Sequence, residues 1–268
     1  MSIVSLRHAL RTQDKIAQIS RLLAPLGGVE AYFAPGESVA ILADGGLPLS
    51  AATGVNAHPA WLYALKEIAL SQGVKEVNIL LHPAPGFDFA QTLQRSGYGD
   101  LAGEKTNLIN LTRQPQLDRP APLDLNRSAY PLYKPLLEAD ALISLSKFKC
   151  DKDLLFGSAV IHLTAGTAEE HDPAAPPDGR TLTDVAALLP ADLHIVDGLR
   201  GSAGYQPQDK DFLAAATDPW ALDTVLTAIA GIPAAQVSYL CLGSQYGLGS
   251  IHPADIVVVG DGLPGSRS

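Results

Sequence analysis

The chain has 268 residues, of which 47% are hydrophobic and 18% charged, and its formal net charge is −9. This composition is typical of a folded globular protein with a sizeable core, and it excludes an intrinsically disordered chain. The negative charge argues against nucleic acid or an anionic membrane as the main partner, because both repel an acidic protein.

The N-terminal segment, residues 1–37, is predicted to be helical and to contain no signal core. Apolar residues recur at helical spacing over residues 14–24, with Asp14 as a helix cap. Charged side chains, Arg7 and Arg11 among them, interrupt the first residues, unlike the apolar core of a signal peptide. No uninterrupted apolar stretch approaches the roughly 20 residues that cross a bilayer. We therefore expect a cytoplasmic protein without a membrane span.

Residues 38–111 alternate between strand and helix patterns, which predicts a parallel sheet. Apolar runs at 38–43, 77–81 and 107–111 have the length of buried strands, and residues 59–71 show the spacing of a helix. A helix between two parallel strands makes a βαβ unit with a right-handed crossover. The sequence thus predicts an α/β fold with a mostly parallel sheet, flanked by helices in Rossmann-like βαβ layers.

Residues 112–130 form an exposed connection rich in proline, arginine and aspartate. A connection of this length without regular structure is long for a compact domain. Three interpretations stay open: a lid, an insertion or a β-hairpin. The connection would divide a domain spanning 38–263 into two lobes, 38–111 and 131–263.

The central stretch, residues 139–166, combines a buried strand with a cluster of lysines. The apolar run 141–145 leads directly into Lys147 and Lys149, which form a local positive patch on an acidic protein. Open α/β sheets bind ligands beyond the carboxyl ends of their strands. If the strand continues, the two lysines share one side-chain parity and face one crevice. The other interpretation is a solvated loop whose lysines only maintain solubility.

Further strands are predicted at 193–196, 212–216 and 256–259, and helices at 181–189, after Pro219 and at 234–245. Thr181 and Asp184 have the spacing of a capping box at the start of the first of these helices. Strand 193–196 is followed directly by an aspartate, a glycine and a turn with two further glycines, which are Asp197, Gly198, Gly201 and Gly204.

Several short motifs resemble those of the family called domain of unknown function 362. The matching residues are Asp140 before the central strand, Lys147-Phe148-Lys149 after it, Asp197-Gly198 with Gly201 and Gly204, and the run from Asp218 to Asp223. The resemblance covers most of residues 38–263 and implies the same α/β fold. Two positions depart from the family pattern: Cys150 stands near its usual histidine, and Val160-Ile161 replaces its lysine–asparagine pair.

The resemblance also implies functional residues. His171 lies where the family tends to have a histidine, and the turn before helix 59–71 is a ligand-binding loop. The candidate catalytic residues are Lys147, Lys149, Asp197, Asp223 and His171, and the candidate ligand-binding residues are Gly54, Asn56, Gly201 and Gly204. Asp218 has a sufficient structural role as a helix cap.

Two different functions fit these residues. In the first, the lysines and glycine-rich turns hold a small carboxylate or phosphate, and an aspartate serves as base, metal ligand or hydroxyl partner. Such a site can transfer protons on a hydroxy- or oxo-acid. In the second, the chain is a non-catalytic binding or partner protein that has lost the family's chemistry. The departures at Cys150 and at 160–161 favour the second, whereas the five candidate catalytic residues together favour the first.

Cofactor and metal chemistry is constrained only in part. Cys150 and Cys241 are the two cysteines, too few for the four thiolates of an ordinary iron–sulfur cluster. We therefore expect no such cluster and no ferredoxin-like cluster domain. The histidines and cysteines lack the close spacing of a zinc motif, so metal binding stays open. The sequence identifies no other cofactor, and a homo-oligomer also stays open.

Overall fold

The computed structural model describes residues 1–150, 156–168, 177–203 and 206–262. A sheet of eight strands forms the centre, in the order β10-β1-β9-β8-β7-β2-β3-β4. Its strands are β1 Ser2–His8, β2 Ser38–Ala43, β3 Glu76–Leu81, β4 Thr106–Asn110, β7 Ala141–Cys150, β8 Leu193–Ala203, β9 Gln206–Ala216 and β10 Ile256–Gly260. Neighbouring strands pair in parallel, except that β9 runs antiparallel to both β8 and β1. The predicted mostly parallel α/β sheet is confirmed.

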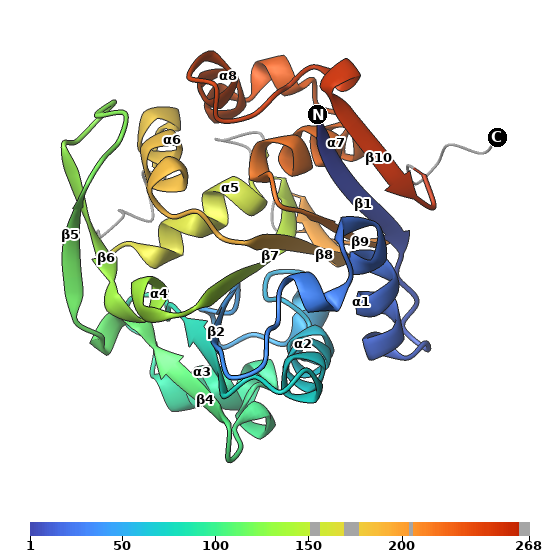
Figure 1. The fold of residues 1–268 in the computed structure, drawn as a ribbon, viewed down its shortest axis with the longest axis vertical. Coiled ribbons are helices and arrows are strands. Elements are labelled where there is room, and N and C mark those ends of the chain that lie inside the picture. Colours follow the sequence, from blue (N-terminus) through green and yellow to red (C-terminus); the bar gives the residue numbers. More distant parts are fainter. Residues whose placement is uncertain (151–155, 169–176, 204–205, 263–268) are drawn as a thin grey trace.

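Helices cover both faces of the sheet (Figure 1). One layer contains α1 Lys15–Leu23, α2 Pro59–Ser71 and α3 Phe89–Ser96; the other contains α4 Lys134–Glu138, α5 Ala159–His162, α6 Gly179–Leu188, α7 Pro219–Ala230 and α8 Ser238–Gln245. Side chains alternate between the layers along each strand, because the strand repeat is two residues. In β2, Val39 and Ile41 pack in the α1–α2 layer and Leu42 in the opposite layer.

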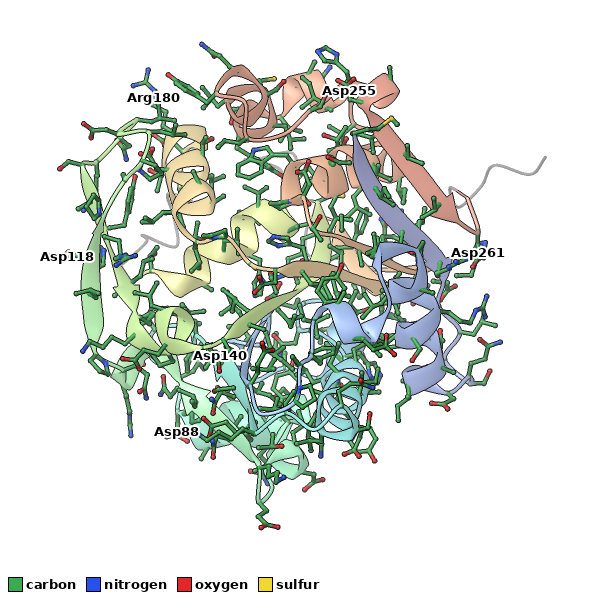
Figure 2. All side chains as sticks on the ribbon, viewed as in Figure 1. Asp88, Asp118, Asp140, Arg180, Asp255 and Asp261 are labelled. Carbon is green, nitrogen blue, oxygen red and sulfur yellow. The ribbon has the colours of Figure 1, made fainter. Side chains whose placement is uncertain are left out.

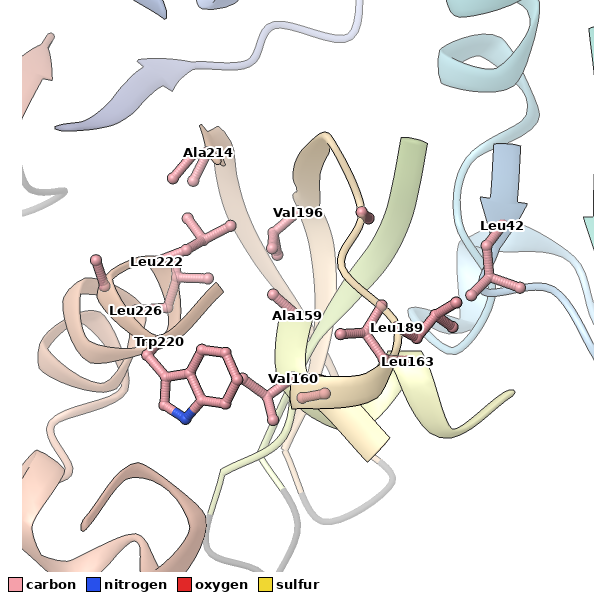
Figure 3. Close-up of a cluster of buried hydrophobic side chains, with 14 of the residues drawn as sticks. Leu42, Ala159, Val160, Leu163, Leu189, Val196, Ala214, Trp220, Leu222 and Leu226 are labelled. Carbon is pink, nitrogen blue, oxygen red and sulfur yellow. The ribbon is translucent and has the colours of Figure 1, made fainter. Parts of the chain in front are cut away.

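The core between the sheet and α5–α8 is made largely of aliphatic side chains, together with aromatic ones such as Trp220, Phe212 and Tyr239. Figure 3 shows Trp220 among the aliphatic residues. Leu42 and Val196 from the strands face helical residues such as Val160 and Leu226, all buried. Burying a side chain of this size contributes about 1.5–3 kcal/mol. In this layer, α5 packs against β7 and β8.

Two predicted helix starts have different outcomes. Asp14 caps α1 as expected, accepting a hydrogen bond from the Ile16 amide at 2.9 Å. The expected capping box of Thr181 and Asp184 is wrong, because α6 begins earlier and Asp178 caps it. Asp184 lies inside the helix and accepts the amides of the loop residues Leu125 and Asn126.

The connection 112–130 contains a two-stranded antiparallel hairpin, which was one of the three interpretations. It pairs β5 Gln116–Pro120 with β6 Ala129–Tyr133, apart from the main sheet. The N-terminal segment also holds more than the expected helix, since β1 lies between β9 and β10 in the sheet. Within the described residues, no helix is long and apolar enough to cross a membrane.

Candidate functional site

The carboxyl edge of the sheet gathers polar side chains from distant parts of the sequence. Every main-sheet strand except β9 runs in one direction, so the ends of β1, β2, β7 and β8 lie along one edge. Arg11 follows β1, Asp44 follows β2, and Lys147 and Asp197 are register partners where the apolar parts of β7 and β8 end. This edge is where open α/β sheets bind ligands.

Lys147 and Asp197 form a buried ion pair. The Lys147 Nζ lies 2.6 Å from the Asp197 Oδ2, and the two side chains are 1% and 0% exposed. Asp197 also accepts the backbone amides of His58 at 2.8 Å and of Leu199 at 2.9 Å. A buried pair persists only when such additional hydrogen bonds offset the loss of hydration. Asp197 therefore joins β7, β8 and the start of α2 through its carboxylate.

Lys149 pairs separately with the turn after β2. Its Nζ lies 2.6 Å from the Asp44 Oδ2, and the Lys149 side chain is 32% exposed. Burial is the largest influence on the pKa of Asp44 and acts to raise it, but Lys149, together with His162 and Lys147, holds that pKa below its ordinary value. β7 continues as a strand through both lysines, so their predicted common parity holds. Each lysine nevertheless has its own carboxylate.

The glycine turn before α2 meets the glycine segment after Asp197, but the predicted turn at Gly201 is wrong, because Gly201 is paired within β8. Gly54 has a φ of +77°, and a β-carbon there would overlap the carbonyl oxygen of Gly201 in β8. Asn56 is buried and donates to the carbonyls of Leu47 and Leu49, both at 2.7 Å. Its amide nitrogen thus holds the loop together. The predicted site residues His171 and Gly204 lie outside the described residues.

Asp223 has a different set of partners. Its carboxylate accepts the amides of Ala159 at 2.8 Å and Val160 at 3.0 Å, and the Tyr239 hydroxyl at 3.0 Å. Burial raises the pKa of Asp223 to about 7, although these hydrogen bonds oppose the rise. In the described part of the chain, it shares no hydrogen bond with Lys147 or Asp197. Asp223 positions the start of α5.

A pocket of about 350 Å³, here called the arginine pocket, opens beside Lys147. Its charged lining residues are Arg11, Arg95, Lys147 and Arg200, and His58 also lines it. None of the described residues that line it is acidic. The concentration of cations contrasts with the net charge of −9 on the whole chain.

The three arginines are held in different ways. Arg11 and Arg200 both bind the carboxylate of Asp209, with Arg200 Nη1 at 3.1 Å. Arg95, at the end of α3, has no hydrogen-bond or ion-pair partner among the described side chains. Two arginines are therefore fixed by Asp209, and one has all of its donors available.

His58 contributes a neutral imidazole to the pocket wall. It is the N-cap of α2, and its Nδ1 accepts the Ala60 amide at 3.2 Å. A neutral ring that accepts at Nδ1 carries its proton on Nε2. Burial lowers the pKa of His58, Asp197 opposes this, and Lys147 lowers the pKa further. His58 is thus uncharged near neutral pH.

The arginines and His58 were missed in the sequence, although one signal was available. His58-Pro59 has the pattern of a cap followed by proline at the first helical position, which places His58 at the sheet edge. Arg11, Arg95 and Arg200 come from three distant segments with no common motif. Among the described residues, no three histidine, cysteine, aspartate or glutamate side chains gather to hold a metal.

Residues 46–228 match the model of the family described as domain of unknown function (DUF362). The chain belongs to this family. The match contains Lys147, Lys149, Asp197 and Asp223, so the DUF362 resemblance predicted from the sequence is confirmed.

A thylakoid-associated protein of Synechocystis is 29% identical to the chain over 155 residues, which are 50% of this chain and 48% of the relative. The chain thus matches about half the length of this curated relative. The lactate racemase apoprotein of Thermoanaerobacterium thermosaccharolyticum is similar with a TM-score of 0.46 and 13% identity, over 85% of this chain and 57% of that one. A protein from Thermotoga maritima gives a TM-score of 0.45 and 12% identity, over 87% and 60%.

Proposed function

We propose that this DUF362 protein binds a small anionic metabolite in the arginine pocket. The observation that carries the proposal is the set of four cationic side chains, with no acidic side chain among the described lining residues, on a chain of net charge −9. Positive side chains that gather in one pocket repel one another, and a bound anion offsets this repulsion. A volume of about 350 Å³ lies within the range of small-molecule sites.

The donors of the pocket suit a carboxylate or a phosphate. A guanidinium offers paired N–H groups that match both anions, and Arg95 has no competing partner in the described structure. Lys147, at the pocket floor, has Asp197 as its single described acceptor, so its ammonium retains donors for a ligand. Asp209 keeps Arg11 and Arg200 in place at the rim.

Proton transfer on a bound hydroxy- or oxo-acid is the reaction that these groups favour. His58 is a neutral imidazole and Lys147 an ammonium, and both line the same pocket. The Lys147 ammonium and the His58 Nε2–H are both donors that would stabilise negative charge on the ligand. The proton from the carbon next to the carboxylate would go to the His58 Nδ1, which would give up the hydrogen bond that it accepts from the Ala60 amide. Asp197, surrounded by three donors, orients Lys147. The alternative, a non-catalytic binding protein, uses the same pocket without this step.

Calorimetric titration with phosphate, malate and lactate tests the binding. We expect Arg95→Gln to weaken binding about tenfold to a hundredfold, since a hydrogen bond to a charged group contributes about 1.5–3 kcal/mol. Arg119→Gln is the matched control, because Arg119 lies on the exposed strand β5. Equal affinities for wild type and Arg95→Gln, or no binding of any of the three anions, would contradict the proposal.

A second measurement separates the enzyme from the binding protein. Proton transfer next to the carboxylate would exchange that hydrogen of lactate or malate for deuterium in heavy water, as followed by NMR. His58→Asn preserves a side-chain acceptor for the start of α2, because asparagine is a good helix cap, but it cannot act as the base. We expect His58→Asn to bind anions and to lose the exchange. Binding without exchange in the wild type supports the non-catalytic alternative.

A further inference from the structure

A second cavity, of about 630 Å³, lies beyond the carboxyl ends of β3 and β4. Its walls come from the turns after these two strands, the start of α3, the β5–β6 hairpin and residues 164–168. It shares no lining residue with the arginine pocket. We call it the aromatic cavity, because four of its lining residues have aromatic rings: His82, Phe87, Phe89 and Tyr133.

Two of the rings are in contact with each other, and one of the others is largely exposed. The His82 and Tyr133 rings lie 5.8 Å apart between centroids, and the Tyr133 hydroxyl is 3.3 Å from the His82 Nε2. Tyr133 is 3% exposed, whereas Phe87 is 48% exposed. Covering an exposed phenyl ring with another ring is favourable, because both lose contact with water and aromatic pairs attract.

The charged groups of this cavity are of opposite sign. They are Arg113, in the turn after β4, and Asp88, at the start of α3. Figure 2 labels Asp88 on the lower part of the molecule. Asp88 caps α3 by accepting the Gln91 amide at its Oδ1, which leaves Oδ2 for another donor. Arg113 has no ion-pair or hydrogen-bond partner among the described residues, and it does not pair with Asp88.

We propose that the aromatic cavity binds an aromatic amino acid in its zwitterionic form. The ligand carboxylate pairs with the Arg113 guanidinium, the ligand ammonium donates to the Asp88 Oδ2, and the ring lies against Phe87 and Tyr133. A ligand with both charges satisfies both side chains, whereas a simple anion meets only one of them. The volume of about 630 Å³ holds a molecule of this size.

Four probes test the class of ligand by calorimetry: L-phenylalanine, L-tyrosine, 3-phenylpropionate and phenethylamine. The third lacks the ammonium and the fourth lacks the carboxylate. We expect at least one of the two amino acids to bind at least tenfold more tightly than either analogue. Arg113→Gln and Asp88→Asn are each expected to weaken that binding about tenfold, and asparagine preserves the cap of α3.

Variants in the arginine pocket provide the matched control. Arg95→Gln is expected to leave amino-acid binding unchanged, so the result does not depend on the function proposed above. Thermal melts of each variant establish that the fold is retained. Failure of both amino acids to bind at millimolar concentration would overturn the proposal. Equal binding of 3-phenylpropionate would also overturn it, because the cavity would then select an aromatic acid without using Asp88.

Discussion

The ion pair Lys147–Asp197 belongs to the candidate site and also stabilises the folded protein. Both side chains are at most 1% exposed, and Asp197 is the acceptor for two backbone amides as well as for Lys147. Loss of one partner from a buried pair leaves the other charge without compensation, at a cost of about 3–5 kcal/mol. We expect Asp197→Ala to lower the free energy of unfolding by this amount, as measured by urea denaturation.

The control for this substitution is Asp118→Ala, on the exposed strand β5. Substitutions at such positions usually change stability by no more than about 0.5 kcal/mol. If Asp197→Ala proved as harmless as Asp118→Ala, the pair would not be buried as described.

Two buried histidines make the protein sensitive to acid. Burial lowers the pKa of His162 to about 4 and that of His194 to about 3, against 6.5 for a free histidine. As the pH falls below 6.5 the unfolded chain takes up protons that the folded chain refuses, so their contribution to stability is complete above pH 6.5 and decreases towards pH 4. By pH 5 each histidine lowers the free energy of unfolding by about 2 kcal/mol.

Urea denaturation at pH 7 and pH 5 measures this loss. We expect His194→Gln to lose less stability between the two pH values than the wild type, and the exposed His252→Gln to behave like the wild type. The comparison isolates His194 from Asp223, whose raised pKa acts in the opposite direction. An identical loss in wild type and His194→Gln would show that His194 is accessible to protons in the folded state.

At the residue scale, the sequence predicts which site residues directly follow a strand. It does not predict the site residues that distant segments contribute. The two-residue repeat of a strand placed Lys147 and Lys149 on one face, and Asp197 followed an apolar run on the next strand. Arg95 reaches the same pocket only because α3 lies at the edge of the sheet. That position depends on tertiary packing, which no local pattern records.

At the scale of elements, the contact between the loop before α2 and β8 depends on a glycine. Gly54 and Gly231 have similar φ angles, +77° and +73°, but a β-carbon at Gly54 would overlap the Gly201 carbonyl, whereas nothing lies within 4 Å of one at Gly231. An alanine in this backbone region costs about 1–2 kcal/mol by itself. We expect Gly54→Ala to destabilise by clearly more than Gly231→Ala, as measured by urea denaturation.

The two alanine variants therefore separate the backbone cost from the overlap. Equal losses of stability would mean that the loop can move away from β8 without penalty. In that case phosphate binding in the arginine pocket should also be unaffected by Gly54→Ala, because Ala51 and Ala52 of the same loop line that pocket.

Strand lengths could be predicted only where the strand is apolar. The runs 38–43 and 77–81 agree closely with β2 and β3, whereas β7 and β8 continue well beyond their apolar parts. The reason is that Lys147 and Asp197 neutralise each other inside the sheet, so charged residues could remain in paired strands. β1 was missed because its partners, β9 and β10, come from the other end of the chain.

At the scale of the whole molecule, one sheet joins both halves of the sequence. β2, β3 and β4 from residues 38–111 continue through β7 into β8 and β9, while β1 links the N-terminal segment to β10. The common strand direction places the arginine pocket and the aromatic cavity at the same carboxyl edge. The sequence could predict this edge, since it follows from βαβ connections alone, but not the division into two cavities.

The two cavities should act independently, because they share no lining residue and helix α3 contributes its start to one and its end to the other. A ligand present at 100 times its dissociation constant stabilises the folded state by about 2.7 kcal/mol. Phosphate and L-phenylalanine together should therefore raise the free energy of unfolding by the sum of their separate effects. Arg95→Gln should remove only the phosphate effect and Asp88→Asn only the phenylalanine effect. A joint effect that differs from the sum by more than about 0.5 kcal/mol would instead show that the two sites are coupled through the edge of the sheet.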